Sequence, residues 1–204
     1  AIEGEWKVSF EPKLDKKFVC KFPALEDFSL SNEERIKYFA GTATYHKNIN
    51  IDLKGDNQRI LLDLGEMNDI AQVWVNGKEV GYSEDSCLPS EFDITDLLEK
   101  GENTLAVKVW KWTDGSYLED ADHWRMSGIH REVLLLHRPD VAINDFGVRT
   151  ILDADYKDAK LWIRPDVSVC GDVDLKGLKV CAKLYDADGN IVADGMEIYA
   201  EEVV

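Results

Sequence analysis

Short alternating runs of hydrophobic and polar residues dominate the chain, and they predict β-strands rather than helices. In the first two thirds of the chain, six runs alternate or are rich in β-branched residues, and Gly, Asn, Asp or Pro bounds each run. These runs are residues 6–10, 42–51, 59–64, 70–75, 104–110 and 131–136. Helical periodicity is weak throughout. Many short strands at regular spacing predict an all-β sandwich or jelly roll.

Turn residues between these runs predict how the strands connect. In VWVNGKEVGY, Asn76 and Gly77 separate two apolar runs, and this pair tolerates the positive φ angles of a type I′ hairpin turn. Residues 92–109, FDITDLLEKGENTLAVKV, predict a short strand and then one helical turn opened by Thr95 or Asp96. A turn at residues 101–103 and a further strand should follow.

A domain boundary is expected near residues 137–143, because Pro139 interrupts the strand pattern there. The predicted domains are residues 1–138 and 139–204. Strands of the second domain are expected at residues 141–152, 160–170, 178–189 and 190–200. The Asp-Ala-Asp-Gly run at 186–189 indicates a turn and not a calcium loop, because the twelve-residue pattern with its final Glu is absent. A complete immunoglobulin-like sandwich takes about 100 residues. The second domain is therefore expected to lack strands unless a partner completes it.

Composition narrows the classes of partner. The net charge of −16 disfavours binding to nucleic acid or to anionic membranes, and no apolar run reaches the 18 residues of a membrane-spanning helix. The first residues lack the pattern of a signal peptide. Because the chain starts at Ala1 and ends abruptly, we expect it to be a fragment of a longer protein. The sequence leaves the compartment open between the cytoplasm and the periplasm or exterior of a bacterium.

The four cysteines, Cys20, Cys87, Cys170 and Cys181, do not predict a zinc site. They form no CxxC pair, and no histidine is placed to complete such a site. Lone cysteines in strand-like runs usually serve as small buried hydrophobes. A disulfide between Cys170 and Cys181 is an open alternative if their strands are adjacent.

The segment WTDGSYLEDADHWRMSGIHREV, residues 112–133, combines four carboxylates at residues 114–122 with two tryptophans. A charged run of this kind is usually a solvated loop. The alternative is a sugar site, because two carboxylates can flank a glycosidic bond and aromatic rings can stack on sugars. A glycosidase pair, however, needs a deep cleft, which a chain of two sandwiches does not obviously provide. We therefore expect no catalytic residue in this chain.

The stretch from residue 42 to about residue 196 closely resembles the non-catalytic N-terminal part of the β-galactosidases of glycoside hydrolase family two. The resemblance is carried by the Asn-Gly hairpin, LPSEFD, the GEN turn, WTDGSYLED, WRMSGI and KLYDADGNIVADG. It implies a galactose-binding-like jelly roll, then an immunoglobulin-like sandwich, and a TIM barrel with two catalytic glutamates that lies beyond this chain. Residues 1–41, with GEWKVSFEPK, look more like the corresponding domain of rhamnosidase-type relatives.

The resemblance also implies site residues. Asp122, two residues before the Trp of WRMSG, corresponds to a residue that contacts the galactosyl unit and a bound sodium ion. A carboxylate suits both tasks, because it accepts hydrogen bonds from hydroxyls and ligates hard cations such as sodium, magnesium or calcium. Trp124 is the second candidate substrate-binding residue, although Trp112 and Trp124 are expected first to anchor the segment on the sandwich and only second to contact sugar.

Neighbouring residues receive smaller roles. His123 gets none, and Arg125 is expected to pair with Glu119, Asp120 or Asp114 rather than with ligand. Cys87 stands where the resembling segment carries an arginine, so any salt bridge of that arginine is lost here.

Three functions therefore compete. The first is the accessory, substrate-shaping part of a retaining β-galactosidase-like hydrolase, inactive alone. The second is an independent carbohydrate-binding module with aromatic loops. The third is a structural role in which the incomplete second sandwich pairs with another chain, a homo-oligomer included.

Overall fold

The computed structural model describes residues 1–52, 59–68, 70–118 and 125–199. The chain divides into two compact units, Ala1–Arg138 and Pro139–Val204. Within the described residues, every regular element longer than a single helical turn is a strand, so the predicted all-β fold class is confirmed. No helix in this part of the chain is long and apolar enough to cross a lipid bilayer.

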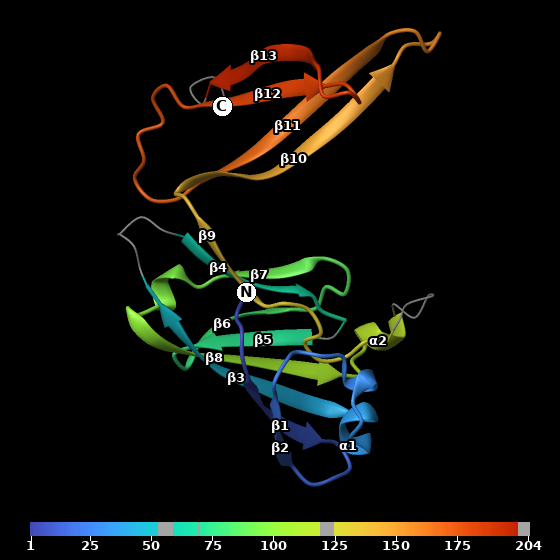
Figure 1. The fold of residues 1–204 in the computed structure, drawn as a ribbon, viewed down its shortest axis with the longest axis vertical. Helices are drawn as coiled ribbons and strands as arrows, with labels where there is room; N and C mark the ends of the chain where they lie inside the picture. The colour runs from blue at the N-terminus through green and yellow to red at the C-terminus, as the bar shows by residue number, and fades with distance from the viewer. Residues whose placement is uncertain (53–58, 69, 119–124, 200–204) are drawn as a thin grey trace. The chain divides into compact units, whose positions relative to one another are not determined.

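The first unit is a sandwich of two antiparallel sheets (Figure 1). In the described residues the larger sheet has the strand order β2 (Phe18–Phe22), β1 (Trp6–Pro12), β3 (Gly41–Ile51), β8 (Gly101–Lys111), β5 (Ile70–Val75) and β6 (Lys78–Ser83). The smaller sheet has the order β7 (Pro89–Asp93), β4 (Arg59–Glu66) and β9 (Leu134–Arg138). Long-range pairs such as β3 with β8 place segments far apart in sequence side by side.

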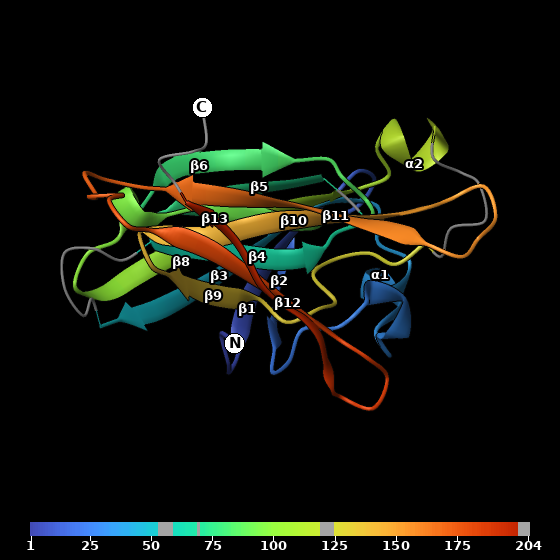
Figure 2. The same cartoon turned by 90° about the horizontal axis from the view of Figure 1, so that it is seen from above.

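Short helical turns connect these strands. They are η1 (Phe28–Leu30), α1 (Glu34–Lys37), η2 (Thr95–Leu97) and α2 (Gly115–Leu118). Figures 1 and 2 both place α1 and α2 at the same end of the first unit. The arrow of β8 also points toward this end, so the segment that follows β8 begins there.

The core of the first unit lies between the two sheets, because alternate residues of each strand point inward. At one end of this core, an aromatic cluster surrounds Phe10, whose side chain has no exposed surface. The Phe10 ring stacks on Phe18 at 4.7 Å and meets Phe39 and Phe28 at 4.9 and 5.3 Å between centroids. These contacts fix residues 23–39, whose only regular elements are η1 and α1, onto the sheet.

The predicted hairpin at Asn76 and Gly77 is confirmed. Both residues have positive φ, 51° and 75°, and they join β5 to β6 as the sequence indicates. The predicted turn at residues 101–103 is wrong, because β8 already begins at Gly101. Asn103 instead stabilises the preceding turn with its side chain. Its amide group donates to the carbonyls of Glu99 and Gly101 at 2.7 and 3.0 Å.

Two further elements differ from the sequence prediction. The run at 131–136 gives a strand only from Leu134 onward, and residues 127–129 before it are held by the loop contacts described below. The hydrophobic pattern does not predict strand β2. Its five residues bury only Phe22, so the pattern there is weak.

The second unit consists of two hairpins in the described residues (Figures 1 and 2). One joins β10 (Val141–Leu152) to β11 (Ala159–Val169), and the other joins β12 (Lys179–Tyr185) to β13 (Ile191–Tyr199). The predicted turn at 186–189 joins the second pair, and the Gly189 N–H donates to the Asp186 carbonyl at 3.2 Å.

None of the described side chains of the second unit is buried. Large apolar residues remain open to solvent, including Phe146 at 64% and Trp162 at 53% exposure. A hollow of about 340 Å³ between the hairpins is lined mainly by Val, Leu and Ile. Sandwich strands normally bury such side chains against a second sheet, so this unit has the surface of half an immunoglobulin-like sandwich.

Asp93, at the end of β7, makes the stability of the first unit dependent on pH. Burial alone raises the pKa of this carboxyl, but hydrogen bonds from Thr95 and the Arg59 guanidinium outweigh it, so the net pKa is lowered. The bonds run from Thr95 Oγ1 at 2.6 Å, Thr95 N at 3.1 Å and Arg59 Nε at 3.0 Å.

We expect this contribution to be present above the unfolded pKa and to be lost as pH falls through the folded value, starting near about pH 5. Asp93→Asn should therefore flatten the loss of unfolding free energy in acid, measured by urea denaturation at a series of pH values. Asp96→Asn is the matched control, because it removes a charge three residues away without these hydrogen bonds. Equal acid slopes for Asp93→Asn and the parent chain would contradict the assignment.

A pinned acidic segment as the candidate functional site

The candidate site residues Asp122 and Trp124 lie outside the described residues, as do Glu119, Asp120 and His123. The structure describes both ends of their segment, residues 112–118 and 125–133. The geometry of these ends shows how the sandwich presents the segment.

The N-terminal end starts with a sharp change of direction. Trp112, directly after β8, has a φ of 69°, a left-handed conformation that costs a bulky residue about 1–2 kcal/mol. Its ring is 44% exposed and lies 6.4 Å from the Tyr117 ring. Helix α2 then forms, with the Asp114 carbonyl accepting from Tyr117 N and Leu118 N at 3.0 Å. The strained turn therefore directs the chain away from the sheet and into α2.

Arg125 ties the C-terminal end of the segment back to its start. Its Nη1 donates to the Ser116 carbonyl at 2.8 Å, and its guanidinium lies 5.3 Å from the centroid of the Trp112 ring. A cation over an indole ring is attractive. Trp112 thus serves in part as an anchor, which is one of the two roles that the sequence allows for it. The predicted ion pair of Arg125 with Glu119, Asp120 or Asp114 stays a prediction.

Residues 127–129 of the WRMSGI run are clamped into the core. Ser127 N donates to Asp27 Oδ1 at 3.2 Å, and the Ser127 carbonyl accepts from Phe28 N at 3.1 Å. Ile129 N donates to the Tyr45 hydroxyl at 3.1 Å. The same Asp27 carboxylate accepts from Ser29 N and Ser29 Oγ at 3.0 and 2.9 Å, so one buried acid joins η1 to the segment.

Gly128 allows this close approach. Its φ is +77°, and a Cβ built on it would lie 2.6 Å from both the Phe28 ring and the Tyr45 hydroxyl oxygen. Only glycine fits such a place without displacement. The Ser-Gly-Ile part of the signature is therefore an anchor that fixes where the acidic segment leaves the sandwich.

A small polar hollow lies beside the N-terminal end of the segment. Its volume is about 160 Å³, and its lining includes Asn68, Glu84, Thr113 and Asp114. This volume is below the roughly 300 Å³ at which small-molecule sites start.

The turn that carries Cys87 lies nearby and is organised by Asp85. The Asp85 carboxylate accepts from the backbone N–H groups of Cys87 and Leu88 at 2.8 and 2.9 Å, and these bonds lower its pKa. Backbone donors thus hold this turn.

The described residues contain no group of three or more His, Cys, Asp or Glu side chains that could hold a metal ion. Cys20, Cys87, Cys170 and Cys181, all of them described, form no disulfide. The alternative of a Cys170–Cys181 disulfide is thereby corrected. Their strands explain it, since β12 pairs with β13 and β11 with β10.

Comparison with known proteins identifies the class to which this fold and segment belong. Residues 26–139 match the family "Glycosyl hydrolases family 2, sugar binding domain". The chain therefore belongs to this family, and the resemblance inferred from the sequence is confirmed.

Individual relatives agree. A β-galactosidase of Priestia megaterium (strain DSM 319 / IMG 1521) is 51% identical over 120 residues, which are 59% of this chain and 12% of the relative. The chain thus spans about one eighth of that protein. The structure of a rhamnosidase from Novosphingobium sp. PP1Y matches with a TM-score of 0.57 at 30% identity, over 67% of this chain and 15% of that one.

The fold as a whole also recurs. A β-glucuronidase of an uncultured Clostridium sp. matches 97% of this chain and 37% of its own, with a TM-score of 0.74 at 24% identity. This likeness covers both units and supports the fold of the second one as well as the first.

Proposed function

We propose that this chain is the non-catalytic, sugar-binding portion of a β-galactosidase-like glycoside hydrolase. In the longer protein it supplies Asp122 and one wall of the substrate pocket to a catalytic TIM barrel. The observation that carries the proposal is the acidic segment fixed at both ends, by Arg125 on one side and by residues 127–129 on the other. The 51% identity to a β-galactosidase over 120 residues of the chain supports it.

In this proposal, the chemistry belongs to the barrel. One glutamic acid protonates the leaving oxygen while a second attacks the anomeric carbon, as in retaining glycosidases. Asp122 accepts hydrogen bonds from hydroxyls of the galactosyl unit, and it is a candidate ligand for a sodium ion whose other ligands come from the rest of the protein. Trp124 borders the same sugar.

Exposed apolar side chains of the second unit support the same proposal. Phe146, Trp162 and Ile198 are 64%, 53% and 42% exposed, and apolar surface of this extent usually marks a contact with further polypeptide. We propose that further parts of the longer protein cover it.

The test is a chimera in which the matching 120 residues of the Priestia megaterium β-galactosidase are replaced by those of this chain. We expect the chimera to hydrolyse a chromogenic galactoside and Asp122→Asn to lower its kcat/KM about 100-fold, since a hydrogen bond to a charged group contributes up to about 3 kcal/mol. Asp120→Asn is the matched control and should retain activity. The 204-residue chain alone should show no turnover above background.

Two results would contradict the proposal. One is cleavage of the galactoside by the chain alone, which would require a catalytic pair within it. The other is an Asp122→Asn chimera that is as active as the Asp120→Asn chimera, which would remove the role of the segment.

A further inference from the structure

The outer face of the large sheet carries a hollow that the acidic segment does not use. Its volume is about 290 Å³, and it is lined by parts of His46, Asn48, Trp74, Thr104 and Ala106 together with neighbouring backbone. This volume is close to the lower limit for small-molecule sites, about 300 Å³, and is nearly twice that of the hollow beside Asp114.

Strand register explains why a hollow forms there. Trp74 of β5 pairs with Ala106 of β8, which pairs in turn with His46 of β3. All three residues are on the outward side of their strands. Neighbouring strands are about 4.8 Å apart, so the two rings start about 10 Å from each other with only a methyl group between them. The small Ala106 side chain thus leaves a slot bounded by two rings.

Side chains that can form hydrogen bonds with a ligand surround this slot. Asn48 and Thr104 are a directly paired set on the next outward position of the same strands. In the described part of the chain, the side chains of His46, Asn48 and Thr104 have no hydrogen-bond partner within the protein, which leaves an imidazole, an amide and a hydroxyl for a ligand. Burial first and the charge of Lys7 second lower the pKa of His46. The imidazole is therefore neutral at pH 7, with one donor and one acceptor nitrogen.

The charges of the lining and of the chain favour some classes of ligand over others. No carboxylate lines the hollow among the described residues. The one cationic side chain there, Lys47, is engaged elsewhere, donating to the Glu5 carbonyl at 2.9 Å and lying 5.5 Å from the Trp6 ring. His46, Asn48 and Thr104 are uncharged, and although Lys7 lies beside His46, the net charge of −16 on the chain disfavours an anionic ligand.

We propose that the hollow between Trp74 and His46 is a second carbohydrate site, which binds one neutral pyranose unit with its C–H face against the Trp74 indole and its hydroxyls at His46, Asn48 and Thr104. An indole with polar groups beside it suits a sugar, which presents an apolar face and a polar rim. A slot one residue wide holds a single ring.

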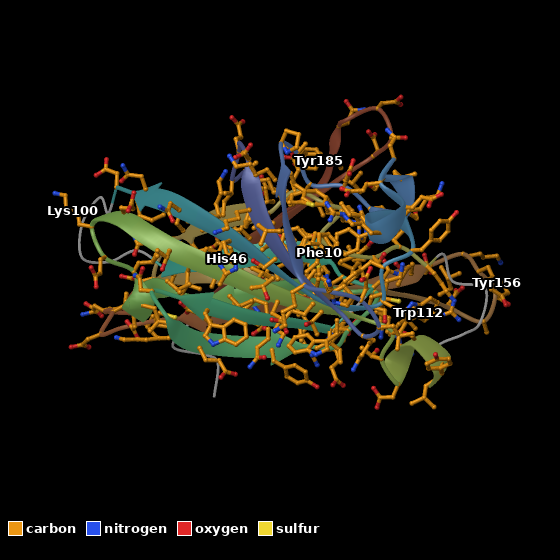
Figure 3. All side chains as sticks on the ribbon, turned by 90° about the horizontal axis from the view of Figure 1, so that it is seen from below. Phe10, His46, Lys100, Trp112, Tyr156 and Tyr185 are labelled. Carbon is orange, nitrogen blue, oxygen red and sulfur yellow. The ribbon has the colours of Figure 1, made fainter. Side chains whose placement is uncertain are left out.

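The site is separate from the acidic segment. Ala106 and Trp112 lie six positions apart along and beyond β8, about 20 Å for extended chain. Figure 3 shows the His46 label toward the Lys100 end of the sheet and Trp112 at the opposite end. This inference therefore goes beyond the proposed function and does not depend on Asp122.

The test is calorimetric titration of the 204-residue chain with lactose, and with glucuronic acid as the anionic comparison. We expect lactose to bind with a millimolar Kd and Trp74→Ala to weaken it at least about tenfold, in line with a lost ring contact of about 1.4 kcal/mol. Ala106→Leu should weaken binding as well, because it fills the hollow and keeps the indole. Trp110→Ala is the matched control, since Trp110 is a partly exposed tryptophan of the same face.

The outcomes separate the two proposals. Binding that survives Asp122→Asn and is lost in both Trp74→Ala and Ala106→Leu supports the second site, whatever the chimera does. Lactose binding that is lost in Asp122→Asn and unchanged in Trp74→Ala overturns it. So does preference for glucuronic acid, or the absence of any heat with lactose well above millimolar concentration. Circular dichroism of each variant confirms that it is folded.

Discussion

Gly128→Ala is expected to lower the free energy of unfolding of the first unit by about 4 kcal/mol, because two effects add. A left-handed φ costs alanine about 1–2 kcal/mol, and the new methyl group overpacks the core for about 1–3 kcal/mol. The atoms it meets at 2.6 Å belong to Phe28 and Tyr45, which are completely buried, so neither can yield.

Gly77→Ala is the matched control for Gly128→Ala. Gly77 has nearly the same φ, +75°, but nothing lies within 4 Å of the place that an added methyl group would take, so only the backbone cost of about 1–2 kcal/mol remains. Urea denaturation followed by tryptophan fluorescence measures both, because all tryptophans except Trp162 precede residue 139. If the two variants lose the same stability, the clamp at residues 127–129 is looser than described.

Asn103→Ala should destabilise the first unit by about 3 kcal/mol. Asn103 is 1% exposed, and its amide joins two separate turns. Its Oδ1 accepts from Glu99 N and Asn76 Nδ2, both at 2.7 Å, and its Nδ2 donates to the carbonyls of Glu99 and Gly101. Removing the amide leaves several partly buried groups unpaired, each at a cost of about 1–3 kcal/mol before water restores some of them.

Two further variants serve as controls for Asn103→Ala. Asn50→Ala removes an exposed asparagine from the neighbouring strand β3 and should cost no more than about 0.5 kcal/mol. Asn103→Asp keeps the acceptor and loses the donors, so its stability should lie between those of the parent and Asn103→Ala. An Asn103→Ala chain as stable as Asn50→Ala would show that the two turns are held by other contacts.

Local sequence predicts most of the strands because burial alternates along them. The run at 70–75 forms β5 with the same bounds, and its alternate residues are buried. The Asn76-Gly77 turn can also be predicted from the sequence, because its φ angles depend on the types of two adjacent residues. In β2 only Phe22 is buried. A single buried side chain gives no alternating pattern, so the sequence does not predict this strand.

The contacts that hold the candidate site have no local signal. Asp27 meets Ser127 across 100 positions of sequence, and Tyr45 meets Ile129 across 84. Nothing in the neighbourhood of Asp27 distinguishes it from the chain's many solvated acids. The resemblance points to Asp122 and Trp124, whereas the anchors of their segment are visible only in three dimensions.

The prediction of a turn at residues 101–103 is wrong for a related reason. Asn103 acts through its side chain, which closes the preceding turn, while its backbone is already in β8. Residue type alone does not tell these two uses of an asparagine apart, because both favour the same short polar side chain.

Fixing both ends of the 112–129 segment has a consequence for how specificity can change. The bond from Arg125 to Ser116 and the clamp at residues 127–129 both lie outside the six residues 119–124. Substitutions at those six places therefore leave these described anchoring contacts in place. Under the proposed function, new residues at those places would alter the preferred sugar while the described anchors stay the same.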